Sequence, residues 1–233
     1  MNGEFINPSS AVEYGPSLTF GDPRLYLRLG ERAINKESSY QEILDTINLA
    51  FDPRSPDSVI PRLSPELALG PNIRVLVDLM NHGNDSLVYL ASITDGEKTE
   101  NFTVLVNQPR RELGSAKREY QNLLRLAEID PRFVVKPIAY LQNENQELYI
   151  TPYIENARCI YGGRHRWGVY DPVPHYHFTP LSNEVANAVN SSMISVLAHY
   201  YDHERGEGLA KTQLSGDDFI IQQGWNIILV PII

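Results

Sequence analysis

The sequence has a single cysteine, Cys159, and no long uninterrupted apolar segment. One cysteine cannot form an internal disulfide, which favours a reducing compartment. A membrane-spanning helix requires about 18 or more consecutive apolar residues, and no such run occurs. The first ten residues, MNGEFINPSS, have neither the basic nor the apolar region of a secretory signal. These absences predict a cytoplasmic protein that is not anchored in a membrane.

Positive charge is also scarce. Lysine and arginine number 20 against 29 aspartates and glutamates, which gives a net charge of -9 over 233 residues. A nucleic-acid backbone or an anionic membrane would repel such a chain, so we expect neither as its partner. The fractions of 42% hydrophobic and 21% charged residues are instead typical of a globular domain.

Residues 1–70 contain seven of the 16 prolines and many small polar residues, so this segment is predicted to be mostly loop. One helix is predicted over residues 39–51, where apolar residues recur at helical spacing. The segment is interpreted as an extension that wraps the domain after it. The alternative is a separate helix that binds a partner.

Residues 71–155 alternate short β-rich runs with turn residues, interrupted by one amphipathic segment. The pattern predicts an α+β domain: a five-stranded antiparallel sheet with one helix, capped by Ser115. The predicted strands cover residues 73–80, 87–94, 101–106, 133–141 and 147–154, and the helix covers residues 115–128.

Residues 156–181 are aromatic, basic and rich in proline, without a sustained period. They are predicted to form a long loop. Its cluster Arg164, His165, Arg166 and Trp167 could clamp a phosphate, stack on a base or contact a protein; the alternative is an ordinary exposed loop. His175 and His177 lie near His165, but no cysteine or carboxylate pair completes a zinc-ligand pattern, so no metal site is predicted.

The last segment, residues 182–233, is predicted to be a long helix over 182–204 followed by a hairpin of strands 219–222 and 225–230. It would form a small second lobe.

Several stretches resemble landmarks of the protein kinases and the related aminoglycoside phosphotransferases. Residues 79–91, LMNHGNDSLVYLA, resemble the glycine-rich first hairpin, with Gly83 on its middle glycine. Residues 117–124 resemble the αC helix, and residues 147–155 resemble the fifth strand and hinge. Residues 211–221, KTQLSGDDFII, resemble the catalytic loop. The resemblance covers residues 73–233 and implies a kinase-like amino-terminal lobe with a reduced carboxy-terminal lobe.

The same alignment shows which chemical groups are missing. The lysine that holds the nucleotide phosphates is replaced by Leu105 or, after a shift of one strand period, by Asn107. The catalytic base is replaced by Gln213, and the magnesium-binding aspartate by Pro231. Arg110 and Arg111 follow the end of this strand, so a guanidinium from either would approach the nucleotide phosphates from another direction than the lysine does.

The resemblance also implies a nucleotide cleft. Glu119 would be the αC carboxylate, or else a solvated helix charge. Asp217 and Asp218 could bind a cation, or else serve as turn residues. The full set of cleft candidates is Gly83, Asn84, Glu119, Pro152, Tyr153, Asp217 and Asp218.

These substitutions predict a catalytically inactive, pseudokinase-like protein that acts by binding a protein partner or a nucleotide. ATP with Mg²⁺ is the cofactor that the resemblance implies. One alternative is a divergent ATP-dependent phosphotransferase whose catalytic groups have migrated to Asp217, Asp218 and Arg110 or Arg111. The other is a non-enzymatic assembly domain that uses the 156–181 loop as its contact surface.

Overall fold

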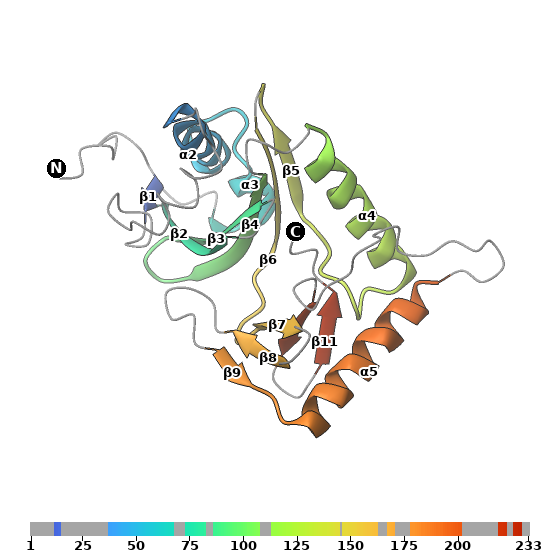
Figure 1. The fold of residues 1–233 in the computed structure, drawn as a ribbon. Helices are drawn as coiled ribbons and strands as arrows, with labels where there is room; N and C mark the ends of the chain where they lie inside the picture. The colour runs from blue at the N-terminus through green and yellow to red at the C-terminus, as the bar shows by residue number, and fades with distance from the viewer. Residues whose placement is uncertain are drawn as a thin grey trace. The chain divides into compact units, whose positions relative to one another are not determined.

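The structure is a computed structural model that describes residues 12–14, 37–67, 73–82, 86–107, 113–144, 146–162, 167–170, 178–201, 219–222 and 226–229. The chain divides into two compact units. The first comprises Met1–Tyr120 with Pro137–Tyr153, and the second comprises Gln121–Lys136 with Ile154–Ile233. In the described parts, each unit contains one β-sheet (Figure 1).

Six described strands form the sheet of the first unit, in the order β1-β2-β3-β4-β6-β5. Strands β2 to β6 pair antiparallel, and β1 pairs parallel to β2. The predicted α+β fold with a five-stranded antiparallel sheet is therefore confirmed, whereas the edge strand β1 was not predicted. The strands are β1 Val12–Tyr14, β2 Arg74–His82, β3 Ser86–Thr94, β4 Thr99–Asn107, β5 Ala139–Gln142 and β6 Glu147–Pro152.

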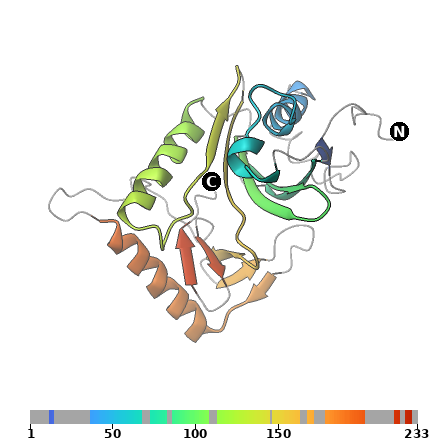
Figure 2. The same cartoon turned by 180° about the vertical axis from the view of Figure 1, so that it is seen from behind.

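Two helices cover one face of this sheet, α2 (Glu37–Phe51) and the short α3 (Ile60–Leu63). Figure 2 shows both beside the strands. Ile43, Ile47 and Phe51 of α2 are buried in the same apolar core as alternate residues of the sheet, as expected for a helix whose apolar residues recur every three or four positions. The helix predicted over residues 39–51 is confirmed.

Helix α4 (Ser115–Ile129) follows the sheet's third antiparallel strand. It begins after Gly114, whose φ of +93° is in the left-handed region that glycine adopts readily. It ends at Asp130, which is followed by Pro131. The helix predicted over residues 115–128 is confirmed within one residue at its end.

The described part of the second unit contains a five-stranded antiparallel sheet, in the order β11-β10-β7-β8-β9. Helix α5 (Asn183–His199) lies against β8 and β11. Its Val189, Met193 and Val196 are buried with Ile160 and Val169 of the sheet. The strands are β7 Arg158–Gly162, β8 Trp167–Tyr170, β9 Phe178–Pro180, β10 Phe219–Gln222 and β11 Asn226–Leu229.

The prediction of a loop over residues 156–181 is wrong for β7, β8 and β9. These strands have five, four and three residues, which is too short for an alternating pattern to stand out in the sequence. They pair with one another in the order β7-β8-β9, and β7 also pairs with β10, more than 50 residues later. The predicted terminal hairpin, β10 with β11, is confirmed. The helix predicted over residues 182–204 is confirmed over Asn183–His199, whereas residues 200 and 201 are not helical.

Among the described residues, no helix combines the length and the apolar character needed to cross a membrane.

Candidate functional site

The face of the first sheet opposite α2 carries the positions that the resemblance assigns to the phosphate-binding lysine. Along β4, Phe102, Val104 and Val106 join the core under α2. Because side chains alternate along a strand, Leu105 and Asn107 belong to the other face. Leu105 is 1% exposed and pairs with Val88 and Tyr149, both buried. An apolar side chain therefore fills the first of the two lysine positions.

Asn107, at the second lysine position, belongs to a buried polar network at the end of β4. Its side-chain Nδ2 donates to Ser115 Oγ at 2.8 Å and to Glu147 Oε2 at 3.1 Å. Both amide hydrogens are thus directed at oxygens that also belong to the first unit. The predicted cap residue Ser115 is the first residue of α4, and its hydroxyl accepts this bond.

Glu147 is at the centre of this network and is 0% exposed. Its Oε2 also accepts the backbone N–H of Ala116 at 3.3 Å, and its Oε1 accepts the hydroxyl of Tyr140 at 2.6 Å. No described lysine, arginine or histidine forms an ion pair with Glu147. The carboxylate is instead stabilised by three donors and by its place at the amino end of α4, where the helix dipole favours negative charge.

Tyr140 closes the network on β5. Burial, followed by the hydrogen bond to Glu147, raises the pKa of Tyr140 well above its ordinary value. Its hydroxyl lies 2.9 Å from Gln142 Oε1, and its ring lies 5.8 Å from the ring of Tyr120 on α4. The network therefore joins β4, β5, β6 and the first two turns of α4.

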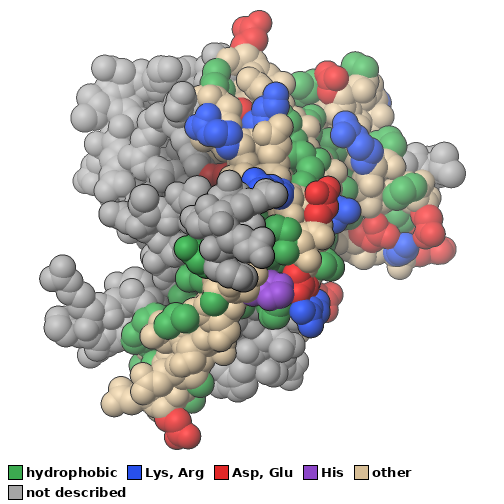
Figure 3. All heavy atoms as spheres, turned by 90° about the vertical axis from the view of Figure 1, so that its right-hand side faces the viewer, with side chains coloured by type: hydrophobic (Ala, Val, Ile, Leu, Met, Phe, Trp, Pro, Cys, Tyr) green, Lys and Arg blue, Asp and Glu red, His purple; other side chains and the backbone are tan. Residues whose placement is uncertain are grey.

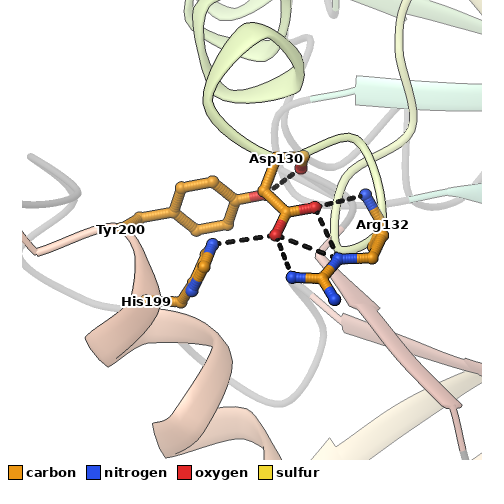
Figure 4. A network of polar contacts seen from close by, with 4 residues as sticks. All are labelled: Asp130, Arg132, His199 and Tyr200. Atoms are coloured by element: carbon orange, nitrogen blue, oxygen red, sulfur yellow. Dashed lines mark hydrogen bonds and ion pairs between the residues drawn. The ribbon is translucent and has the colours of Figure 1, made fainter.

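A second polar cluster lies in the second unit and centres on Asp130 (Figure 4). Arg132 donates to its carboxylate through the backbone N–H at 3.0 Å and through Nη2 at 2.6 Å. His199 Nε2 lies 2.9 Å from Asp130 Oδ2, and the Tyr200 hydroxyl donates to the Asp130 carbonyl at 2.7 Å. One residue at the end of α4 thus binds both residues at the carboxyl end of α5.

Hydrogen bonds, charge and burial shift the pKa values of Asp130, Arg132 and Tyr200 in this cluster. The hydrogen bonds from Arg132 hold the pKa of Asp130 well below its ordinary range. Burial, and then the negative charge of Asp130, raise the pKa of Tyr200 to about 12. The side chain of Asp130 is only 9% exposed, whereas those of Arg132 and His199 are 72% and 39% exposed. Figure 3 shows a face on which a histidine (purple) lies beside acidic and basic side chains.

Neither cluster was predicted from the sequence. Asn107 was predicted only as a substitute for lysine, and Asp130 lies beyond the end of the helix predicted over residues 115–128. Glu147 could have been noticed as an acidic residue at the start of an otherwise apolar strand. Within the described residues, no group of three or more His, Cys, Asp or Glu side chains is placed to hold a metal ion.

The described candidates for a nucleotide cleft are Glu119, Pro152 and Tyr153. Glu119 is half-buried on α4, and Pro152 is exposed at the end of β6. The backbone N–H of Tyr153 donates to the Asn101 carbonyl at 3.3 Å. The candidates Gly83, Asn84, Asp217 and Asp218 lie outside the described residues, as do Gln213 and Pro231.

In the predicted interaction cluster, Arg164, His165 and Arg166 also lie outside the described residues. Trp167 is the first residue of β8 and packs, partly buried, against the core beneath α5. No protein-family model and no curated protein matches this sequence. What the chain does is therefore inferred from its own residues.

Proposed function

We propose that this protein is a kinase-like binding module that does not transfer phosphate. The resemblance implies the order strand, strand, strand, helix, strand, strand, and β2, β3, β4, α4, β5 and β6 follow each other in that order. Strands β2 to β6 belong to one antiparallel sheet, and the first turn of α4 is hydrogen-bonded to it. This agreement supports a kinase-like amino-terminal lobe.

The observation that carries the proposal is the chemistry of β4. Phosphoryl transfer in kinases uses a lysine on the third strand to hold the nucleotide phosphates. Strand β4, TENFTVLVN, contains neither lysine nor arginine. Leu105 is buried among apolar side chains, and Asn107 is neutral and donates to Ser115 and Glu147. The strand therefore supplies no cation for a phosphate group.

We therefore expect the protein to bind a ligand without transferring phosphate. The ligand is either a protein partner or a nucleotide that is not turned over. The acidic chain, with its net charge of -9, would also repel a polyphosphate that is not accompanied by a cation. A protein partner is accordingly the ligand that we favour.

A phosphotransfer assay tests this proposal. The full chain is incubated with ATP and Mg²⁺ in the presence of protein and small-molecule hydroxyl acceptors, and product formation is compared with that of Asp218→Ala. Glu144→Ala, a change at an exposed turn residue, is the control. We expect no turnover by any of the three proteins. Turnover that is abolished by Asp218→Ala but kept by Glu144→Ala would overturn the proposal and favour the divergent phosphotransferase.

A further inference from the structure

The first turn of α4 donates a backbone hydrogen bond to a side chain from another part of the chain. The carbonyl of Gly114 accepts the first helical bond, from the Arg118 N–H at 3.0 Å, but glycine has no side chain with which to bond the free N–H groups of the first turn. Glu147, 31 residues later on β6, accepts from Ala116 instead. The helix start is thereby tied to the sheet.

The same hydrogen bond also stabilises the buried carboxylate of Glu147. A fully buried carboxylate that has no ion-paired cation among the described residues is tolerated only when hydrogen-bond donors surround it. Ala116 is one of the three donors to Glu147, together with Asn107 and Tyr140. Movement of the first turn of α4 away from the sheet would remove a donor from the buried carboxylate, so the undocked position of this turn is penalised.

We propose that Glu147 is a positioning residue that keeps the first turn of α4 docked on the sheet of the first unit whether or not a nucleotide is present. In a kinase, a lysine on the third strand pairs with a glutamate on the αC helix, and control of that pair controls activity. Here the connection between the third strand and the helix runs from Asn107 to Ser115 and through Glu147 to Ala116. The comparison with kinases rests on the proposed function, whereas the docking of α4 rests on these contacts alone.

The docked helix gives the protein a preformed surface. A binding module gains affinity when its recognition surface is already ordered, because less conformational freedom is lost on binding. The function of the Glu147 network is therefore to fix the first turn of α4 on the sheet, with no step that depends on phosphate.

Amide hydrogen exchange in the full chain tests this inference. Glu147→Met removes the acceptor at similar volume, and we expect the amides of residues 116–119 to exchange about tenfold faster, the effect of one lost hydrogen bond. Glu147→Gln keeps one acceptor oxygen and should restore most of the protection. Glu144→Gln, at the exposed turn, should leave it unchanged. Amides in the middle of β3 and β4 should keep their protection in all three variants.

Saturating ATP with Mg²⁺ should leave the protection of residues 116–119 in the wild-type protein unchanged, and this arm decides the matter if Glu147→Met does not fold. Two results would overturn the inference: faster exchange that is uniform over the sheet and α4 in Glu147→Met, or a rise in α4 protection when nucleotide is added to the wild type. Phosphotransfer activity with unchanged α4 exchange would refute the proposed function but leave this inference standing.

Discussion

Asn107 and Glu147 are 40 residues apart in the sequence, yet the Asn107 Nδ2 and Glu147 Oε2 atoms lie 3.1 Å apart. Each is one residue beyond the pair Val106 and Leu148, with which the ladder of β4 and β6 ends. The two side chains continue the contact between the strands where the backbone pairing stops. They do so beneath the first turn of α4, because Glu147 also accepts from Ala116.

Tyr140→Phe removes the hydroxyl that donates to Glu147 and leaves the ring in place. We predict a loss of about 2 kcal/mol in the free energy of unfolding, as is typical for a hydrogen bond to a charged group. Urea denaturation at pH 7 measures this loss. Tyr120→Phe, which alters the neighbouring ring of the pair, is the matched control and should cost much less. Equal losses in the two variants would contradict the role of the hydroxyl.

Tyr200→Phe removes the hydrogen bond from the hydroxyl to the Asp130 carbonyl. We expect a loss of about 1 kcal/mol in the free energy of unfolding, the usual net value of a neutral hydrogen bond. Tyr201→Phe alters the next residue, which is 53% exposed, and should have no measurable effect. Equal stability of Tyr200→Phe and Tyr201→Phe would contradict a stabilising role of the Tyr200 hydroxyl.

The depressed pKa of Asp130 predicts a pH dependence of stability. Because its pKa is lower in the folded state than in the unfolded state, its contribution is complete above the ordinary carboxyl pKa and is lost as the pH falls from about 5 toward the depressed value. Asp130→Asn removes this contribution. The stability difference between wild type and Asp130→Asn, measured by urea unfolding between pH 7 and pH 3, should therefore shrink as the pH falls.

Asp57→Asn provides the control for that titration, since Asp57 is exposed and its carboxylate accepts no hydrogen bond from the described residues. Its stability difference from wild type should be small and constant over the same range. A difference for Asp130→Asn that does not change between pH 7 and pH 3 would contradict the assignment.

A substitution at Gly168 tests the packing of β8 and β9, the strands that lie where a loop was predicted. A side-chain carbon at this position would overlap the ring of Phe178 on β9 and would lie 2.8 Å from the Thr179 carbonyl oxygen. We predict that Gly168→Ala lowers the free energy of unfolding by about 2 kcal/mol through overpacking. Gly96→Ala has open space and only a positive φ to overcome, so it should cost about 1 kcal/mol or less. If Gly168→Ala is no worse than Gly96→Ala, β8 and β9 do not pack as described.

The long elements are the ones that the sequence predicts most clearly. Strands β2, β3 and β4 have nine residues each, and helices α2 and α4 have 15 residues each, so alternation or helical spacing is visible over several repeats. The three-residue strands β1 and β9 have no such pattern. Strand β1 also pairs with β2, about 60 residues later, which local sequence does not specify.

The buried networks escaped prediction for a related reason. Asp130 and His199 come together across 69 positions, and Asn107 and Glu147 across 40. Sequence alignment with the kinases identified Asn107 only as a missing lysine. The side chain's actual partners, Ser115 and Glu147, became evident only from the packing of the helix start on the sheet.

The central claim is that strand β4 supplies no cation for a phosphate group, and a comparison of ATP with adenosine tests it most directly. Isothermal titration of the full chain in the presence of Mg²⁺ gives both affinities. We predict that ATP binds no more tightly than adenosine, or that neither binds, because β4 carries no cation. An affinity for ATP ten times or more that for adenosine, lost in Arg110→Gln or Arg111→Gln, would contradict the account, because it would show that a guanidinium has taken over the role of the lysine.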